Sequence, residues 1–203
     1  WQFDPGKEFR LTAGSSLSWP GRNFSMRFNY AIIDNYIYMG NDAMPARHEG
    51  GLSVISLVAR KDIVLWKLHW DNTVLVQQSS NNDVLSLPLV TARSTFFFDH
   101  VFTFRSTGGE LFFQLGVEAM LHTPYYAMNY MPATGRFFSQ SDTKIGNYPF
   151  ANAFINLKVK RTRIFVMLDH LNSGLTGYEY FLLPTYPLNI RMIRYGIAWT
   201  FYD

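Results

Sequence analysis

The final stretch of the chain, from Arg191 to Asp203, alternates between two kinds of side chain with a period of two residues. The apolar set contains Ile193, Tyr195, Ile197, Trp199 and Phe201. The small or polar set contains Met192, Arg194, Gly196, Ala198 and Thr200. A period of two places the sets on opposite faces of a β-strand. We therefore predict a strand over residues 190–202 with one wholly apolar face.

The composition of the chain fits many such strands. Hydrophobic residues make up 48% of the sequence and aromatic residues 17%. Nevertheless, no stretch approaches the ~20 consecutive apolar residues of a membrane helix. Strands that present a side chain to lipid at every second position combine these properties. The composition suits a membrane β-barrel, and a soluble aromatic-rich β-sandwich is the alternative.

Charge and cysteine content argue against several other classes. Lys and Arg total 18 and Asp and Glu total 15, so the formal net charge is +3. This charge is too small, without clustering, to predict nucleic-acid binding. The absence of Cys excludes a disulfide framework and a cysteine metal site. The sequence begins at Trp1 without Met or signal peptide, which we interpret as processing or as a fragment.

Alternating segments divide the chain into about nine strands, which we assign to a single domain over residues 1–203. Tight turns are expected at Trp19–Arg22, Arg60–Asp62, Ser106–Gly109 and Lys160–Arg161. Long loops are expected at Gly40–Gly51, Ser79–Pro88, Tyr125–Phe150 and Asn172–Leu188. A bulge is expected near Asp34, and the phase of the strand at 52–59 stays open. Short turns at one end and long loops at the other are typical of outer-membrane barrels.

This layout predicts an all-β fold, namely a transmembrane antiparallel up-and-down β-barrel with a periplasmic C-terminus. Single-chain bacterial barrels usually have an even number of strands. A sheet with open edges is not viable in lipid. About nine strands therefore predict the C-terminal part of a larger barrel, closed by the strand at 190–202.

Two segments resemble parts of known outer-membrane proteins. The stretch from Arg194 to Phe201 is similar to the insertion signal of bacterial outer-membrane barrels, although Tyr202 and Asp203 follow its last aromatic residue. The residues that match this signal are Arg194 in the polar place, Gly196 in the glycine place, and Trp199 and Phe201 in the hydrophobic places. This resemblance implies insertion by the barrel-assembly machinery.

A second motif is the segment Lys144–Phe150, which reads KIGNYPF, together with the strands after it. Those strands carry Asn152 and Phe154, then Thr162, Arg163 and Phe165, and then Asp169 and His170. The region from Pro124 to Asp203 resembles the closing strands of the "putative porin" family of Bacteroidota. The resemblance implies a bacterial outer-membrane porin surrounded by the lipid bilayer and lipopolysaccharide.

The polar faces of these strands are expected to line the lumen. The candidate lumen residues are Arg10, Arg27, Lys67, Arg93, Asp99, Arg105, Glu118, Lys158, Arg163, Asp169 and Arg194. Cations outnumber carboxylates in this set, and rings of Lys and Arg favour anions in pores. The alternative is that the charges pair across neighbouring strands and only fill the wall.

Large aromatic residues near the strand ends suit the two interfaces of a membrane. The candidates for such a girdle are Trp19, Tyr36, Tyr38, Trp66, Trp70, Tyr195, Trp199 and Phe201. The alternative is ordinary core packing.

Two Asp-His dipeptides, Asp99-His100 and Asp169-His170, are the residues that most suggest catalysis. Adjacent strand residues point to opposite faces, so neither dipeptide forms a dyad. His100 on a lipid-facing side is unexpected, because a charge there is costly. We predict no enzyme activity, no cofactor and no metal site.

The sequence therefore predicts a porin-like channel for passive diffusion of small solutes, with a weak anion preference. The alternative is a non-catalytic accessory barrel subunit of a larger outer-membrane assembly, whose loop at Tyr125–Phe150 docks partner subunits. A soluble sandwich that binds a ligand or protein agrees less well with the alternating turns and the C-terminal signal. No nucleic-acid partner is expected.

Overall fold

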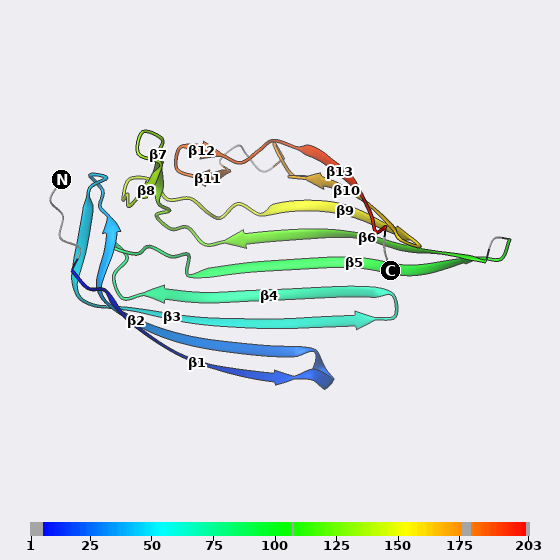
Figure 1. Ribbon diagram of the computed structural model, residues 1–203, viewed down its shortest axis with the longest axis horizontal. Coiled ribbons are helices and arrows are strands. Elements are labelled where there is room, and N and C mark those ends of the chain that lie inside the picture. The colour runs from blue at the N-terminus through cyan, green and yellow to red at the C-terminus, as the bar shows by residue number, and fades with distance from the viewer. Residues whose placement is uncertain (1–5, 107, 176–179, 202–203) are drawn as a thin grey trace.

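A nine-stranded antiparallel sheet dominates the computed structural model, which describes residues 6–106, 108–175 and 180–201 (Figure 1). The strands of this main sheet are β1 (Phe9–Trp19), β2 (Phe24–Met39), β3 (Pro45–Leu65), β4 (Leu68–Ser79), β5 (Val90–Phe104), β6 (Gly109–His122), β9 (Phe150–Val159), β10 (Thr162–Asp169) and β13 (Met192–Trp199). Every strand pairs with the next of this series in chain order. The predicted all-β, up-and-down architecture is confirmed.

The remaining elements are short. They are the 3-10 helix η1 (Pro20–Arg22) and the strands β7 (Asn129–Met131), β8 (Arg136–Phe138), β11 (Phe181–Leu183) and β12 (Tyr186–Pro187). Two small hairpins, β7–β8 and β11–β12, fold within segments that the sequence predicts only as loops. Within the described ranges, no helix is long and apolar enough to cross a membrane.

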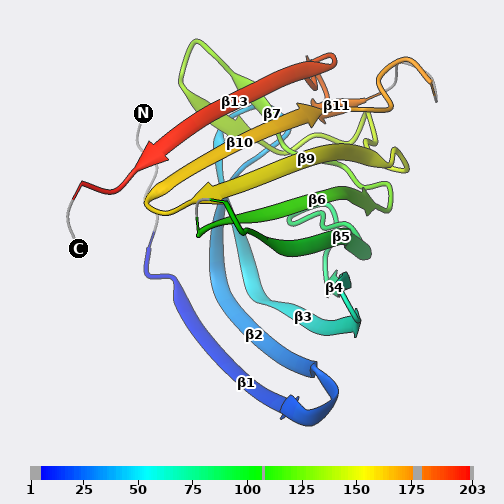
Figure 2. The same cartoon turned by 90° about the vertical axis from the view of Figure 1, so that its right-hand side faces the viewer.

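The main sheet curves into an open trough with β1 at one edge and β13 at the other (Figure 2). In the described part of the chain these two edge strands do not pair with each other. The sheet is thus an unclosed barrel wall, consistent with a partial barrel.

Short and long connections lie at opposite ends of the sheet, on the right and left of Figure 1 respectively. Below, the turn end is the end of the sheet that carries η1, the Trp66–Lys67 turn, the β5–β6 turn and the Lys160–Arg161 turn. The loop end is the opposite end, which carries the connections at 40–44, 80–89, 123–149 and 170–191. The predicted alternation of short and long connections is confirmed except at 40–44, which is only five residues long.

Two predicted connections near β3 are wrong. The chain does not turn at Arg60–Asp62: β3 continues to Leu65, and the hairpin turns at Trp66, whose φ is +60°. Arg60 and Asp62 simply continue the alternation, and Lys61 between them donates a hydrogen bond to the Arg22 carbonyl. The loop predicted at Gly40–Gly51 is also too long, because Pro45 already pairs with Met39. The expected bulge is present, with a register shift between Asp34 and Tyr36.

The predicted closing strand at 190–202 is longer than the observed strand β13. Beyond Trp199, the backbone N–H of Thr200 bonds to the carbonyl of Arg161 in the β9–β10 turn. Regular pairing ends there because β10 begins only at Thr162. Tyr202 lies outside the described residues.

Register assigns the strand residues to two faces, because directly opposed residues point to the same side of a sheet. An apolar row runs along the convex face from β3 to β13: Leu65, Leu68, Phe98, Leu115, Ile155, Val166 and Tyr195. The opposite, concave face carries most of the charged strand residues. Large apolar side chains on the convex face are widely exposed, including Ile197 at 71% and Tyr195 at 80%. The sheet therefore presents its apolar side outward.

Candidate functional site on the concave face

Several concave-face charges form ion pairs, as the pairing alternative anticipates. Arg93 on β5 lies 3.0 Å, Nε to Oε2, from Glu118 on β6. Arg10 pairs with Glu8 next to its own strand at 2.8 Å, and Arg194 on β13 pairs with Asp169 on β10. His69 on β4 forms a hydrogen bond with Asp99 on β5, with 3.1 Å between Nε2 and Oδ1. The three pairs that involve arginine cancel part of the charge along the wall.

A second group of concave-face cations has no such partner. Lys158 on β9 and Arg163 on β10 are directly opposite in register, and Arg27 lies on β2. Among the described residues, no carboxylate forms an ion pair with any of these three side chains. Like charges directly opposite each other are destabilising, so Lys158 and Arg163 favour a neighbouring anion or water.

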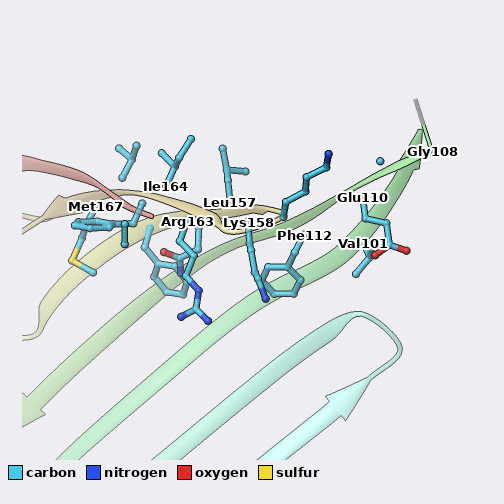
Figure 3. Close-up of a pocket in the computed structure, with 16 residues that line it drawn as sticks. Val101, Gly108, Glu110, Phe112, Leu157, Lys158, Arg163, Ile164 and Met167 are labelled. Atoms are coloured by element: carbon cyan, nitrogen blue, oxygen red, sulfur yellow. The ribbon is translucent and has the colours of Figure 1, made fainter. Parts of the chain in front are cut away.

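The Lys158–Arg163 pair faces an open hollow near the turn end. Figure 3 shows both side chains on the same side as Phe112 and Met167, whereas Leu157 and Ile164 point the other way. The hollow has a volume of about 1060 Å³. Its position places two full positive charges at the edge of a space large enough for small solutes.

A carboxylate pair on other strands complements these cations. Asp62 on β3 and Asp71 on β4 are directly opposite in register and belong to the concave face. Sequence reasoning did not select them, because it placed a turn at Asp62. The sequence offers no clear signal for them, because polar and apolar residues are mixed on both faces from Val58 to Leu65. Asp62 and Asp71 thus lie on β3 and β4, whereas Glu110 of β6 lines the same hollow as Lys158 and Arg163.

Two predicted lumen residues lie outside the strands. Lys67 belongs to the β3–β4 turn, and its Nζ is 3.1 Å from Nε2 of His100, a convex-face residue. The prediction of Lys67 as a wall residue is therefore wrong, because the turn lies six residues later than predicted, at 66 instead of 60. Arg105 follows the end of β5 at Phe104 and lies at the mouth of the turn end.

The aromatic candidates divide into two groups. Trp19, Trp70, Tyr195 and Trp199 are exposed convex-face residues, and Trp66 is 80% exposed at the turn. Tyr36 and Tyr38 instead pack against the buried residues Ile33 and Leu52. The girdle prediction is wrong for these two tyrosines, because the bulge at Asn35 interrupts the alternation and turns them toward the concave side.

The residues that match the insertion signal have clear local contacts. Arg194 pairs with Asp169, and Gly196 lies under the ring of Phe165. A Cβ at Gly196 would come within 2.5 Å of Phe165 Cε1. Trp199 stacks on Phe201 with ring centroids 5.4 Å apart. These contacts give each position a structural role, and the signal itself stays a prediction.

A buried histidine joins the loops at the loop end. His170 is 1% exposed; its Nε2 is 2.7 Å from Tyr148 Oη and its Nδ1 is 2.5 Å from the Asn189 carbonyl. Tyr148 comes from the segment 123–149, and Asn189 from the segment 170–191. His170 therefore connects two long loops, and both of its ring nitrogens take part in these contacts.

Another contact within the first long loop is the isolated bridge between Tyr125 and Ile145. Burial raises the pKa of the Tyr125 hydroxyl above its ordinary value, so this group stays neutral at physiological pH. Lys144, next to Ile145, places its Nζ 4.9 Å from the ring centroid of Tyr126. The loop is therefore anchored by its own aromatic residues.

The Asp-His dipeptides form no dyads, because Asp99 pairs with His69 and Asp169 pairs with Arg194. In the described portion of the chain, no group of three or more His, Cys, Asp or Glu residues is arranged to hold a metal ion.

Comparison with known protein families gives a match over the whole chain. A family model described as "Putative porin" matches residues 1–203, from the first residue of the sequence to the last. No curated protein and no solved structure matches the chain.

Proposed function

Because the chain belongs to the putative porin family, and is thus a porin-like channel protein of the bacterial outer membrane, we propose that it conducts small solutes passively along its concave face. Family membership indicates a channel without enzymatic activity. The observation that carries the proposal is the distribution of side chains between the two faces of the sheet, which is the reverse of that in a water-soluble protein. Exposed apolar residues cover the convex side, and the ion-paired and unpaired charges line the concave side. This arrangement suits lipid outside and water inside.

A weak preference for anions follows from the charges that remain unpaired. Arg27, Lys158 and Arg163 have no carboxylate partner within the described ranges, and Arg105 adds a cation at the mouth of the turn end. Arg60 is a further concave-face cation without a carboxylate partner among the described residues. On the acidic side, the described carboxylates without a Lys or Arg partner are Asp62, Asp71, Glu110 and Asp99, which bonds to His69. Since cations lining a pore lower the energy of a passing anion, five cations against four carboxylates favour anions slightly.

We place all 203 residues in a single barrel domain, with the turn end and the C-terminus in the periplasm. The residues Arg194, Gly196, Trp199 and Phe201 then act as the signal that the barrel-assembly machinery recognises. Short periplasmic turns and longer outer loops agree with this orientation. The loop end faces lipopolysaccharide.

The second candidate is a non-catalytic accessory barrel subunit in a larger assembly. The observation that favours it is the joined loop end, where Tyr130 contacts Tyr186 at a centroid distance of 6.0 Å and Thr185 bonds to Asn129. This layer also exposes apolar side chains, including Phe137 at 50% and Leu182 at 62%. Such a surface suits partner subunits.

Single-channel recording of the purified full-length protein in a planar lipid bilayer tests the proposal. Steady ohmic conductance with a small shift of reversal potential toward that of the anion is the expected result. A silent bilayer from a preparation that contains a stoichiometric second protein would instead favour the accessory subunit. Gentle purification, with identification of every co-purifying chain, belongs to the same experiment.

A further inference from the structure

A polar cluster interrupts the apolar convex face at the turn end. Lys67 in the β3–β4 turn contacts His100 on β5, with 3.1 Å between Nζ and Nε2. The same Nζ lies 4.6 Å from the ring centroid of Trp66. His100 is surrounded by aromatic rings, with Phe102 at a centroid distance of 4.5 Å. A histidine and a lysine among lipid-facing aromatic residues require an explanation, since polar groups in lipid are costly.

The hydrogen bond has one direction when Lys67 is an ammonium group. An ammonium group can only donate, so Nε2 of His100 is the acceptor. Lys67 has three N–H donors and uses one of them on His100. Its other two N–H groups form no hydrogen bond with the described residues.

Carboxylates that could neutralise Lys67 belong to the other side of the sheet. Asp99 is adjacent to His100 in sequence but lies on the concave face, where it pairs with His69. Asp62 and Asp71 also belong to the concave face. No described carboxylate forms an ion pair with Lys67. Lys61, another convex-face cation, adds positive charge at the same end.

Apolar surface lies immediately beside this cation. Trp66 is 80% exposed and Leu65 is 68% exposed, and Leu68 and Phe98 continue the apolar row on the convex face. A ligand that matches both the cation and the apolar row has an anionic head, whose oxygens accept hydrogen bonds from Lys67, and a long apolar body. The complementary charge and the adjoining apolar row therefore specify an anionic lipid.

We propose that Lys67, His100 and Trp66 form a binding site for the headgroup phosphate of a phospholipid in the leaflet next to the turn end. The phosphate oxygens accept hydrogen bonds from the two remaining N–H groups of Lys67. Trp66 lies at the headgroup level, and the acyl chains cover Leu65 and Leu68. His100 orients the ammonium group from below. The site does not depend on conduction by the concave face.

Native mass spectrometry of the purified full-length protein in neutral detergent tests this site. The probes are dioleoyl phosphatidylglycerol and dioleoylglycerol, which share their acyl chains and differ in the phosphate headgroup. The wild type is expected to retain the phosphatidylglycerol and to bind dioleoylglycerol much more weakly. Equal retention of both lipids would overturn the proposal.

Lys67→Gln is expected to lower phosphatidylglycerol retention about tenfold, because it removes a charge-assisted hydrogen bond donor. Lys67→Arg should retain most of the binding, which separates a charge effect from a folding effect. Lys144→Gln is the matched control, since Lys144 also lies over an aromatic ring but at the loop end. Unchanged retention in Lys67→Gln, or an equal loss in Lys144→Gln, would contradict the assignment.

Discussion

Arg194 of β13 and Asp169 of β10 form an ion pair across the last strand pair of the sheet, with 2.7 Å between Nη2 and Oδ1. Asp169 is only 8% exposed, whereas the arginine reaches it from the exposed edge strand. The same guanidinium also contacts the sulfur of Met167. One side chain thus holds a buried carboxylate and the outermost strand together.

Arg194→Gln should therefore loosen β13 from β10, because it leaves the Asp169 carboxylate buried without its partner. The expected result is a lower temperature for loss of the compact form in heat-modifiability gels. Arg10→Gln is the control, since the Arg10–Glu8 pair joins residues two apart at an exposed edge strand. Equal melting of the two variants would show that the pair does not hold the edge.

Gly196→Ala should destabilise the same edge through a steric effect. The new methyl group would overlap the ring of Phe165, which lies over the glycine. Overpacking of this kind costs about 1–3 kcal/mol, measurable by urea unfolding of the refolded protein in detergent. Gly21→Ala is the matched control, since a Cβ there meets nothing within 4 Å. If both variants unfold at the same urea concentration, the Phe165 contact is not tight.

The double variant Trp199→Ala with Phe201→Ala should reduce assembly into the outer membrane, because it removes both hydrophobic places of the proposed signal. These residues are 63% and 73% exposed, so their loss creates no cavity. Surface levels in cells are the measurement. Leu182→Ala, which truncates another exposed apolar side chain at the loop end, should leave these levels unchanged. Normal levels of the double variant would exclude the signal.

Lys158→Gln with Arg163→Gln should shift ion selectivity toward cations, since it removes two unpaired charges from the wall. The reversal potential under a salt gradient in a planar bilayer measures the shift. Arg93→Gln with Glu118→Gln is the control, because it removes an ion pair and leaves the net charge unchanged. The anion preference has another source if the two double variants behave alike.

His170→Ala should release the loop end while the sheet stays folded. The substitution removes the hydrogen bonds of His170 to the Tyr148 hydroxyl and the Asn189 carbonyl, each worth about 0.5–1.5 kcal/mol. Trypsin cleavage near Lys144 and Arg191 is expected to become faster. Tyr148→Phe removes only the hydroxyl and should have a smaller effect. Unchanged cleavage of His170→Ala would mean that other contacts hold the loops.

Much of the sheet could be predicted from period-two alternation alone. The final strand, the hairpin turn at Lys160–Arg161 and the bulge after Asp34 all follow from side-chain pattern, and the structure confirms them. The β3 region could not be phased, because Leu52 to Ala59 is apolar on both faces. In the structure, Leu52 is buried against Ile33 on the concave side. The apolar residues of this segment therefore serve packing on the concave face as well as contact with lipid on the convex face.

Charge clusters misled the sequence prediction at two places. Arg60, Lys61 and Asp62 suggested a turn, although their side chains alternate between faces along a continuous strand. Conversely, the true turn at Trp66 and Lys67 contains neither Gly nor Pro and offers no usual turn signal. Ion pairs such as Arg93–Glu118 depend on register between strands, which a single sequence does not specify when the turn between them has no fixed length.

The grouping of short turns at one end has a consequence for how such a wall can change during evolution. Insertion or deletion of one hairpin alters the circumference by two strands and leaves every other connection on its own side of the membrane. Insertion of a single strand would send all later connections to the opposite side. The two-stranded hairpin is therefore the unit that can be gained or lost in this architecture. The long loops can change in sequence and length without altering the pairing of the strands.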